Sequence, residues 1–183
     1  MLAIVGCDPG VTGGLSLIIH GKLTAIFDMP VVEEAGKKKL DYNEDGTPVE
    51  KIGVSHSVDP YGVKRILTNW RDMAFVKDLP VRLVIEKMWS RKGQASTSND
   101  KLIYGAGLVT GIALGLGFDV KTVAPATWKS KMKVTADKGT SLQLARQVVQ
   151  GQHEWVGVFR RKKDNGRAEA FLIGLWGHID AHK

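Results

Sequence analysis

The stretch that decides the fold is Leu2-Ala3-Ile4-Val5-Gly6-Cys7-Asp8, followed by the turn Pro9-Gly10-Val11-Thr12-Gly13-Gly14 and the run Leu15-Ser16-Leu17-Ile18-Ile19. The two apolar runs predict a β-hairpin, and Asp8 stands where its first strand ends. A rigid strand holds a carboxylate more firmly than a loop does, and turn glycines let a bulky anion approach the backbone. Three interpretations remain open for Asp8: a metal ligand, part of a phosphate-binding loop, or a hairpin without chemistry.

The composition indicates one domain with a polyanionic partner. The chain has 183 residues, enough for a single domain with a proper core. Lysine and arginine exceed aspartate and glutamate by 26 to 19, a net charge of +7, which favours nucleic acid as the partner.

Cysteine content and hydropathy exclude several kinds of protein. Cys7 is the single cysteine, which excludes an internal disulfide and a thiolate zinc site. Because side chains alternate along a strand, we expect Cys7 to face the core, opposite to Asp8, and not to act as a nucleophile. No apolar run is long enough to span a bilayer, so we expect no membrane partner and a cytoplasmic protein.

The region from residue 31 to residue 57 interrupts the apolar periodicity. It contains Glu33-Glu34, Lys37-Lys38-Lys39 and Asn43-Glu44-Asp45-Gly46. We expect a partly flexible insert, with a possible hairpin turn at Glu44-Asp45-Gly46. The lysine triplet fits a solvated loop better than a track for a phosphate backbone.

The rest of the chain alternates between strand and helix patterns. Such an order is typical of an α/β fold, here a mixed sheet with helices on both faces. The expected strands cover 2–8, 15–19, 22–30, 81–86 and 119–123, and the expected helices cover 60–74, 98–117, a short segment from 125, 137–150 and 167–180.

Carboxylates mark the ends of several of these elements. Asp8 and Glu86 end two strands, and Asp164 and Glu169 stand at the start of the last helix. If the first and fourth strands are neighbours, Asp8 and Glu86 face one another, and carboxylates so close repel unless cations share the site. Oxygen ligands favour Mg²⁺ or Mn²⁺, and two such ions can drive phosphodiester hydrolysis by water.

Two of the acids have competing structural roles. Glu169 interrupts a small, apolar helical surface, where an unpaired carboxylate is costly, so the alternative is an ion pair with Arg167 or Arg161. Asp164 fits a metal ligand and a helix N-cap equally well, and one residue can be both.

Four segments occur in a distinctive order and spacing, namely Asp8-Pro9-Gly10-Val11-Thr12-Gly13, Val84-Ile85-Glu86-Lys87, Val123-Ala124-Pro125-Ala126-Thr127-Trp128-Lys129 and Lys163-Asp164-Asn165-Gly166-Arg167-Ala168-Glu169-Ala170. Together they resemble the RuvC-type Holliday-junction resolvases, particularly their phage-type branch. The resemblance covers nearly the whole chain outside the insert. If a phage encodes the protein, we expect it in the host cytoplasm.

The resemblance implies a ribonuclease-H-like fold over 1–183 and a homodimer that resolves four-way DNA junctions by paired, Mg²⁺-dependent nicks in DNA recombination and repair. It matches Asp8, Glu86 and Glu169 to the family's metal ligands, two ions to each active site, and makes Asp164 the candidate for a fourth ligand. In the bacterial enzymes the last two acids are three positions apart. Here they are five apart, and Gly166 holds the intermediate place.

The resemblance also implies contacts with DNA. Lys129, Lys131 and Lys133 fall in a basic segment that approaches the scissile phosphate, where a cation stabilises negative charge. Met88 and Trp89 stand where the family has an apolar wedge that opens base pairs, although packing beneath a loop is the alternative. Arg91 and Lys92 follow in the same loop and are expected to contact phosphates.

The helix from Asn99 to Gly117 contains four glycines and is our candidate for the dimer surface, with packing on the sheet as the alternative. Three rival functions stay open. One is the same chemistry on forks, flaps or other branched DNA. Another is an ATP-binding protein of the actin or sugar-kinase type, which needs a second phosphate loop and an adenosine motif that are not visible. The third is a junction binder without catalysis.

Overall fold

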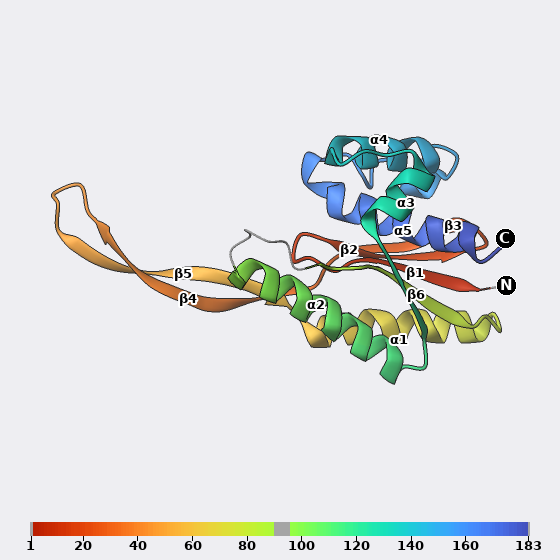
Figure 1. The fold of residues 1–183 in the computed structure, drawn as a ribbon, viewed down its shortest axis with the longest axis horizontal. Helices are drawn as coiled ribbons and strands as arrows, with labels where there is room; N and C mark the ends of the chain where they lie inside the picture. The colour runs from red at the N-terminus through yellow and green to blue at the C-terminus, as the bar shows by residue number, and fades with distance from the viewer. Residues whose placement is uncertain (1, 90–95, 183) are drawn as a thin grey trace.

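The computed structural model describes residues 2–89 and 96–182 (Figure 1). Its centre is a five-stranded sheet with the order β3-β2-β1-β6-β7. β1, β2 and β3 form an antiparallel meander, whereas β6 and β7 run parallel to β1. The predicted mixed sheet is confirmed. Its strands are β1 (Ala3–Asp8), β2 (Gly14–Ile19), β3 (Lys22–Asp28), β6 (Val81–Glu86) and β7 (Asp119–Val123).

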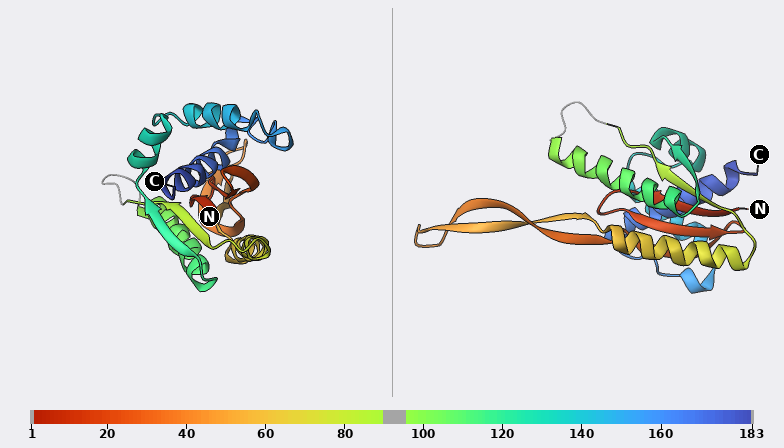
Figure 2. Two further views of the ribbon diagram at one scale, coloured as in Figure 1. Left: turned by 90° about the vertical axis from the view of Figure 1, so that its right-hand side faces the viewer. Right: turned by 90° about the horizontal axis from the view of Figure 1, so that it is seen from below.

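Helices cover both faces of the sheet (Figures 1 and 2). Side chains alternate along β1, so Val5 packs against one helical layer and Ile4 against the other. One layer contains α1 (Pro60–Val76) and α2 (Ser96–Gly115). The other contains α3 (Pro125–Met132), α4 (Lys138–Val149) and α5 (Asn165–Asp180), with short 3-10 turns at His153–Trp155 and Lys162–Asp164.

The helix boundaries follow local chemistry. Asp59 caps α1 by accepting a hydrogen bond from the Tyr61 backbone N–H at 2.9 Å, and Pro60 occupies the first turn. α2 begins two residues before the predicted start, and α5 begins at Asn165, directly after a 3-10 turn, instead of at Arg167. Within the described ranges, no helix has the length and apolar character that crossing a membrane requires.

α5 lies unusually close to the centre of the sheet. A Cβ atom at Gly6 would stand 2.2 Å from the Ala170 carbonyl oxygen and 2.4 Å from the Gly174 backbone nitrogen. The buried Ser16 hydroxyl donates to the same carbonyl at 2.9 Å. This contact between glycine backbones fixes the position of α5, and therefore of Glu169, relative to β1.

The insert forms a long two-stranded ribbon that projects away from the body (Figure 2). Its strands are β4 (Val31–Tyr42) and β5 (Pro48–Val58), and the Gly46 backbone N–H donates to the Asn43 carbonyl in the turn. The possible turn near Glu44-Asp45-Gly46 is thus observed, in a regular hairpin. The register places four apolar residues that are 60–65% exposed on the same face as the ion pair of Lys38 with Glu50, namely Leu40, Tyr42, Ile52 and Val54.

Removing the outer ribbon should leave the body folded. Val58 at its base is buried in the core, but the outer strands pair mainly with each other, and the Lys101 ammonium donates to the Ser55 hydroxyl near the base. We expect replacement of residues 35–54 by an Asn-Gly turn to change the thermal unfolding midpoint by less than about 3 °C, since little core is lost. Differential scanning calorimetry measures this, and a large drop would show that the ribbon stabilises the domain.

Candidate active site

Asp8 and Glu86 stand side by side at the ends of two adjacent parallel strands. In the register of β1 with β6, Cys7 pairs with Ile85, so the next residues along each strand are Asp8 and Glu86. Neighbouring strands are about 4.8 Å apart. Cys7 and Ile85 belong to the core beneath α1 and α2, and therefore both carboxylates project toward the layer that contains α5.

The Cys7 thiol lies close to the negative charges of Asp8 and Glu86. The thiol is fully buried, and burial raises its pKa well above the ordinary value, with further increases from the charges of Asp8 and Glu86. The thiol therefore stays protonated and lies in the core. The burial of Cys7 in the core beneath α1 and α2 confirms that it is a packing residue.

α5 supplies the third carboxylate of the site. Glu169 is only 7% exposed, and its Oε1 accepts hydrogen bonds from the Lys129 ammonium at 2.9 Å and from the Ser141 hydroxyl at 3.3 Å. The predicted alternative of an ion pair with Arg167 or Arg161 is not observed, because Lys129 on α3 is the partner.

The three carboxylates line one cleft of about 410 Å³. The cleft lies at the ends of β1 and β6, and its other lining residues come from α2, α3, α5 and the segments between these elements. The cleft combines acids with a lysine and an aromatic side chain, a suitable set for binding cations and a phosphate backbone. Its lining residues are Asp8, Gly10, Thr12, Glu86, Lys87, Met88, Trp89, Leu102, Pro125, Lys129, Ala136 and Glu169.

The structure does not bring Asp164 to these carboxylates. Its side chain is 1% exposed, and its carboxylate accepts from the Arg161 guanidinium at 2.9 Å and from that of Arg167 at 2.5 Å. Arg167 also contacts Asp28 at 3.0 Å and so ties α5 to the end of β3. Asp164 occupies the N-cap position of α5, but its side chain makes no capping hydrogen bond to the helix. The sequence offered Asp164 as a candidate fourth ligand. In the structure its carboxylate instead forms a buried ion pair with Arg161 and Arg167, outside the cleft lining.

Asp164 should make stability depend on acid pH. Burial raises the pKa of this carboxyl, but the hydrogen bonds from Arg161 and Arg167 outweigh burial and lower the pKa from 3.8 to about 2. A folded-state pKa below the unfolded one stabilises the protein above about pH 4, and this stabilisation is lost as the pH falls toward 2. We expect Asp164→Asn to cost roughly 2 kcal/mol at pH 7 and progressively less below pH 4. Denaturant unfolding across this range measures it, and a cost independent of pH would contradict the assignment.

Gly166 holds α5 against the turn that follows Asp8. A Cβ atom at this position would lie 1.9 Å from the Thr12 carbonyl oxygen and 2.7 Å from the Gly13 Cα. No acidic side chain fits there. The difference in acid spacing noted from the sequence thus has a steric cause, because this chain packs its helix directly on the turn.

The candidate DNA-binding residues fall into three groups. Met88 and Trp89 line the cleft, and Trp89 is 56% exposed. Lys131 and Lys133 are exposed on α3 and at its C-terminus, outside the cleft lining. Arg91 and Lys92 lie outside the described residues.

The sequence did not single out two residues that belong to the site, one that lines the cleft and one that binds a cleft carboxylate from the core. Lys87 lines the cleft, and its ammonium lies 4.1 Å from the centre of the Trp89 ring. Trp128 is fully buried, and its indole N–H donates to Glu86 Oε2 at 2.6 Å. Lys87 was within reach of sequence reasoning because it directly follows Glu86. The contact of Trp128 joins residues 42 positions apart and has no local signal.

The donor set fits a hard divalent cation. Three carboxylates supply the oxygen ligands that Mg²⁺ and Mn²⁺ prefer. As the side chains stand, no group of three or more His, Cys, Asp and Glu among residues 2–89 and 96–182 is close enough together to hold an ion. The cation beside Glu169 is the Lys129 ammonium. Binding a metal through all three acids therefore requires side-chain rearrangement within the cleft.

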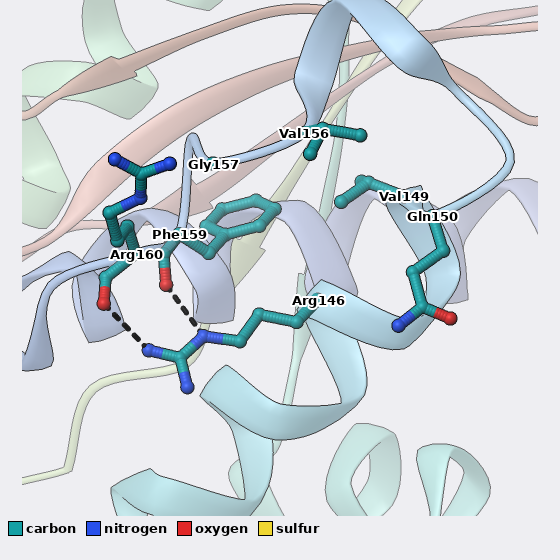
Figure 3. Close-up of a pocket in the computed structure, with 7 residues that line it drawn as sticks. All are labelled: Arg146, Val149, Gln150, Val156, Gly157, Phe159 and Arg160. Atoms are coloured by element: carbon teal, nitrogen blue, oxygen red, sulfur yellow. Dashed lines mark hydrogen bonds between the residues drawn. The ribbon is translucent and has the colours of Figure 1, made fainter.

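A separate cavity of about 390 Å³ lies between α4 and the segment that follows it (Figure 3). There the Arg146 guanidinium donates to the Phe159 and Arg160 carbonyl oxygens at 2.7 and 2.9 Å (Figure 3). No candidate site residue from the sequence lines it. These two hydrogen bonds hold the segment around Phe159 against α4, so the Arg146 guanidinium has a structural role.

Comparison with known proteins relates the chain to junction resolvases. No family model matches. The chain is 36% identical over 76 residues, 40% of its length, to the chloroplastic Holliday junction resolvase MOC1 of Chlamydomonas reinhardtii. That alignment covers 8% of the relative, so the chain corresponds to a small part of it.

Among solved structures, the chain is similar to Thermus thermophilus RuvC in complex with a Holliday junction substrate. The TM-score is 0.57 and the sequence identity is 16%, and the alignment covers 100% of this chain and 96% of that one. A weaker likeness, with a TM-score of 0.44 and 14% identity over 97% and 78% of the chains, is to the yeast mitochondrial resolvase Ydc2. The protein therefore has the ribonuclease-H-like fold of RuvC-type resolvases, and a segment of it is similar in sequence to a Holliday-junction resolvase.

Proposed function

We propose that the protein is a structure-selective DNA endonuclease that resolves four-way junctions by metal-dependent phosphodiester hydrolysis. The observation that carries the proposal is the convergence of Asp8, Glu86 and Glu169 from three separate elements on one cleft. The RuvC fold and the similarity to a resolvase support the choice of substrate.

The acids and the lysine of the cleft suit metal-dependent hydrolysis of a phosphodiester. When bound, two Mg²⁺ or Mn²⁺ ions supply a Lewis acid and lower the pKa of water so that it can attack the phosphate. Asp8, Glu86 and Glu169 would hold the ions. The Lys129 ammonium, which lines the same cleft, would stabilise the negative charge on the phosphate. The nucleophile is water, so no side chain of the protein needs to form a covalent intermediate.

Residues at the cleft mouth would engage the junction. Trp89 is exposed beside the acids, and Met88 lies next to it, a suitable place for an apolar wedge at the centre of opened base pairs. Lys87 at the cleft, together with Lys131 and Lys133 on α3 and at its end, would supply positive charge for phosphates. Binding should therefore weaken steeply with salt. Arg91 and Lys92 stay candidates from the sequence.

The wedge role of Trp89 has a direct test. We expect Trp89→Ala to reduce opening of the junction centre about tenfold, because loss of stacking costs about 1–3 kcal/mol per base, while linear-duplex binding changes little. Fluorescence of 2-aminopurine at the branch point measures opening. Equal losses for junction and duplex would remove the proposal. Tyr61→Ala, at another exposed aromatic residue but outside the cleft, is the control.

A homodimer is part of the proposal because symmetric cutting needs two active sites. The outward face of α2 is suitable: Ile103, Tyr104 and Leu114 are exposed, and the Cβ positions of Gly107 and Gly111 meet no atom within 4 Å among the described residues. Gly105 instead packs closely against Val58 and Pro9. α2 therefore packs on the sheet with one side and offers the other side to a second copy, which combines the two alternatives from the sequence.

The substrate is tested with labelled four-way junction, fork, flap and linear duplex, each incubated with Mg²⁺ or EDTA. We expect paired symmetric nicks confined to the junction and no cleavage in EDTA. Similar rates on forks and flaps would replace junction resolution by general branched-DNA cleavage. Junction binding without cleavage in Mg²⁺ or Mn²⁺ would favour a non-catalytic binder, and ATP binding would favour the kinase-like alternative.

A further inference from the structure

Glu86 is held by a buried indole. Trp128 has no exposed surface, and its Nε1–H donates to Glu86 Oε2 at 2.6 Å. An indole nitrogen is a donor only, so this bond requires an acceptor such as a carboxylate oxygen. Hydrogen bonds to ionised acceptors are shorter and stronger than neutral ones. The contact therefore restrains one oxygen of the Glu86 carboxylate.

α3 presents this indole from a firmly anchored position. Pro125 starts the helix, and Lys133 ends it in the left-handed conformation with its N–H bonded to the Lys129 and Ser130 carbonyls. The Trp128 ring packs in the core shared with α4 and α5, among side chains such as Phe171 and Leu142. Its rotamer is thereby fixed by packing on all sides, and the N–H cannot follow a moving carboxylate.

Neighbouring residues of α3 bind two different carboxylates. Trp128 binds Glu86 at the end of β6, and Lys129 binds Glu169 on α5 at 2.9 Å. These roles differ in kind, because Lys129 is a cleft-lining cation on a long, flexible stem and Trp128 is a fully buried neutral donor. A cation in the cleft would compete with Lys129 for Glu169 but not with the indole N–H of Trp128.

We propose that Trp128 is a positioning residue, which fixes the orientation of Glu86 so that its carboxylate is preorganised for the metal. This inference rests on the proposed metal-dependent function. Groups that orient a metal ligand by hydrogen bonding typically contribute 10–100-fold to metal affinity. Without the indole N–H, Glu86 samples more rotamers, and each metal-binding event must first restrict them.

The test removes the indole N–H of Trp128 while a buried aromatic ring stays at position 128. Trp128→Phe is compared with Trp70→Phe, a substitution of another buried tryptophan, which packs in the opposite core and stacks on Phe27. A third protein carries 3-benzothienyl-alanine at position 128, which keeps the ring shape and replaces the N–H by sulfur. This isostere keeps the test valid if the phenylalanine variant fails to fold.

Mn²⁺ binding to the DNA-free protein is measured by isothermal titration calorimetry, and nicking of a four-way junction is measured as a function of Mn²⁺ concentration. We expect the isostere and Trp128→Phe to raise the Mn²⁺ dissociation constant about tenfold or more. The Mn²⁺ concentration for half-maximal nicking should rise in parallel, while the rate at saturating Mn²⁺ returns close to that of the wild type. Trp70→Phe should leave both metal constants unchanged.

Two results separate the possible failures. An unchanged Mn²⁺ dissociation constant in the folded isostere would overturn the role of Trp128 and leave the proposed function standing. If the wild type binds no Mn²⁺, or if Glu86→Gln binds it as well as the wild type does, the proposed metal site itself is wrong.

Discussion

Asp8→Asn is expected to abolish junction cleavage while the protein still binds the junction. Asp8 ends β1 beside Glu86 and shares the cleft with Glu169, so the substitution removes one of three negative charges for the metal. Metal ions contribute several kcal/mol of transition-state stabilisation, which corresponds to a rate loss of about 10³-fold or more. Single-turnover nicking of a labelled four-way junction measures the rate, and electrophoretic mobility shift measures binding in Ca²⁺.

The matched control is Asp119→Asn. Asp119 begins β7, is exposed and pairs with Arg82, so it carries the same charge outside the cleft. We expect nicking within about twofold of the wild type, since exposed ion pairs contribute little. Comparable cleavage by Asp8→Asn and Asp119→Asn would remove Asp8 from the chemistry.

Gly166→Ala should be among the most destabilising single-methyl changes in the protein. Its Cβ would overlap the Thr12 carbonyl oxygen at 1.9 Å, and backbone atoms on both sides cannot rotate away as a side chain can. Overpacking of this kind costs roughly 3 kcal/mol. For a domain of this size, the thermal unfolding midpoint should fall by roughly 6–12 °C. Cleavage should also fall, because α5 and the turn after Asp8 are pushed apart.

Gly111→Ala is the opposite case in the same protein. It lies in the interior of α2, with no described atom within 4 Å of its Cβ position. In the monomer, where no second copy covers this face of α2, alanine there should stabilise the helix by up to about 1 kcal/mol. Calorimetry on both variants compares the two sites. Equal effects would show that steric contact with the turn does not determine the cost at Gly166.

The strand-end carboxylates could be predicted from sequence because local pattern and topology agree there. Asp8 and Glu86 each end a short apolar run, whose length and β-branched residues fit a buried strand better than a helix. Cys7 was placed in the core by the same alternation. The position of Glu169 followed from the cost of an acid in a small, apolar helix surface, which the partner Lys129 offsets in the structure.

The remaining features depend on contacts between distant segments. The role of Asp164 is decided by Arg161 and Arg167, which surround it in three dimensions, whereas its sequence context fits a cap or a ligand equally well. The bond from Trp128 to Glu86 joins α3 to β6 and has no periodic pattern. The regular pairing of β4 with β5 was obscured because charged and apolar residues both lie on a solvent-exposed ribbon.

Asp8, Glu86 and Glu169 together form the proposed metal site, and anomalous difference density of crystals grown or soaked with Mn²⁺ tests this. We expect Mn²⁺ peaks in the cleft within about 2.0–2.3 Å of oxygens from these carboxylates, with Lys129 moved away from Glu169 and Asp164 still bound to its two arginines. Mn²⁺ bound to Asp164, or a cleft that takes up no Mn²⁺ while Lys129 stays on Glu169, would contradict the proposed site.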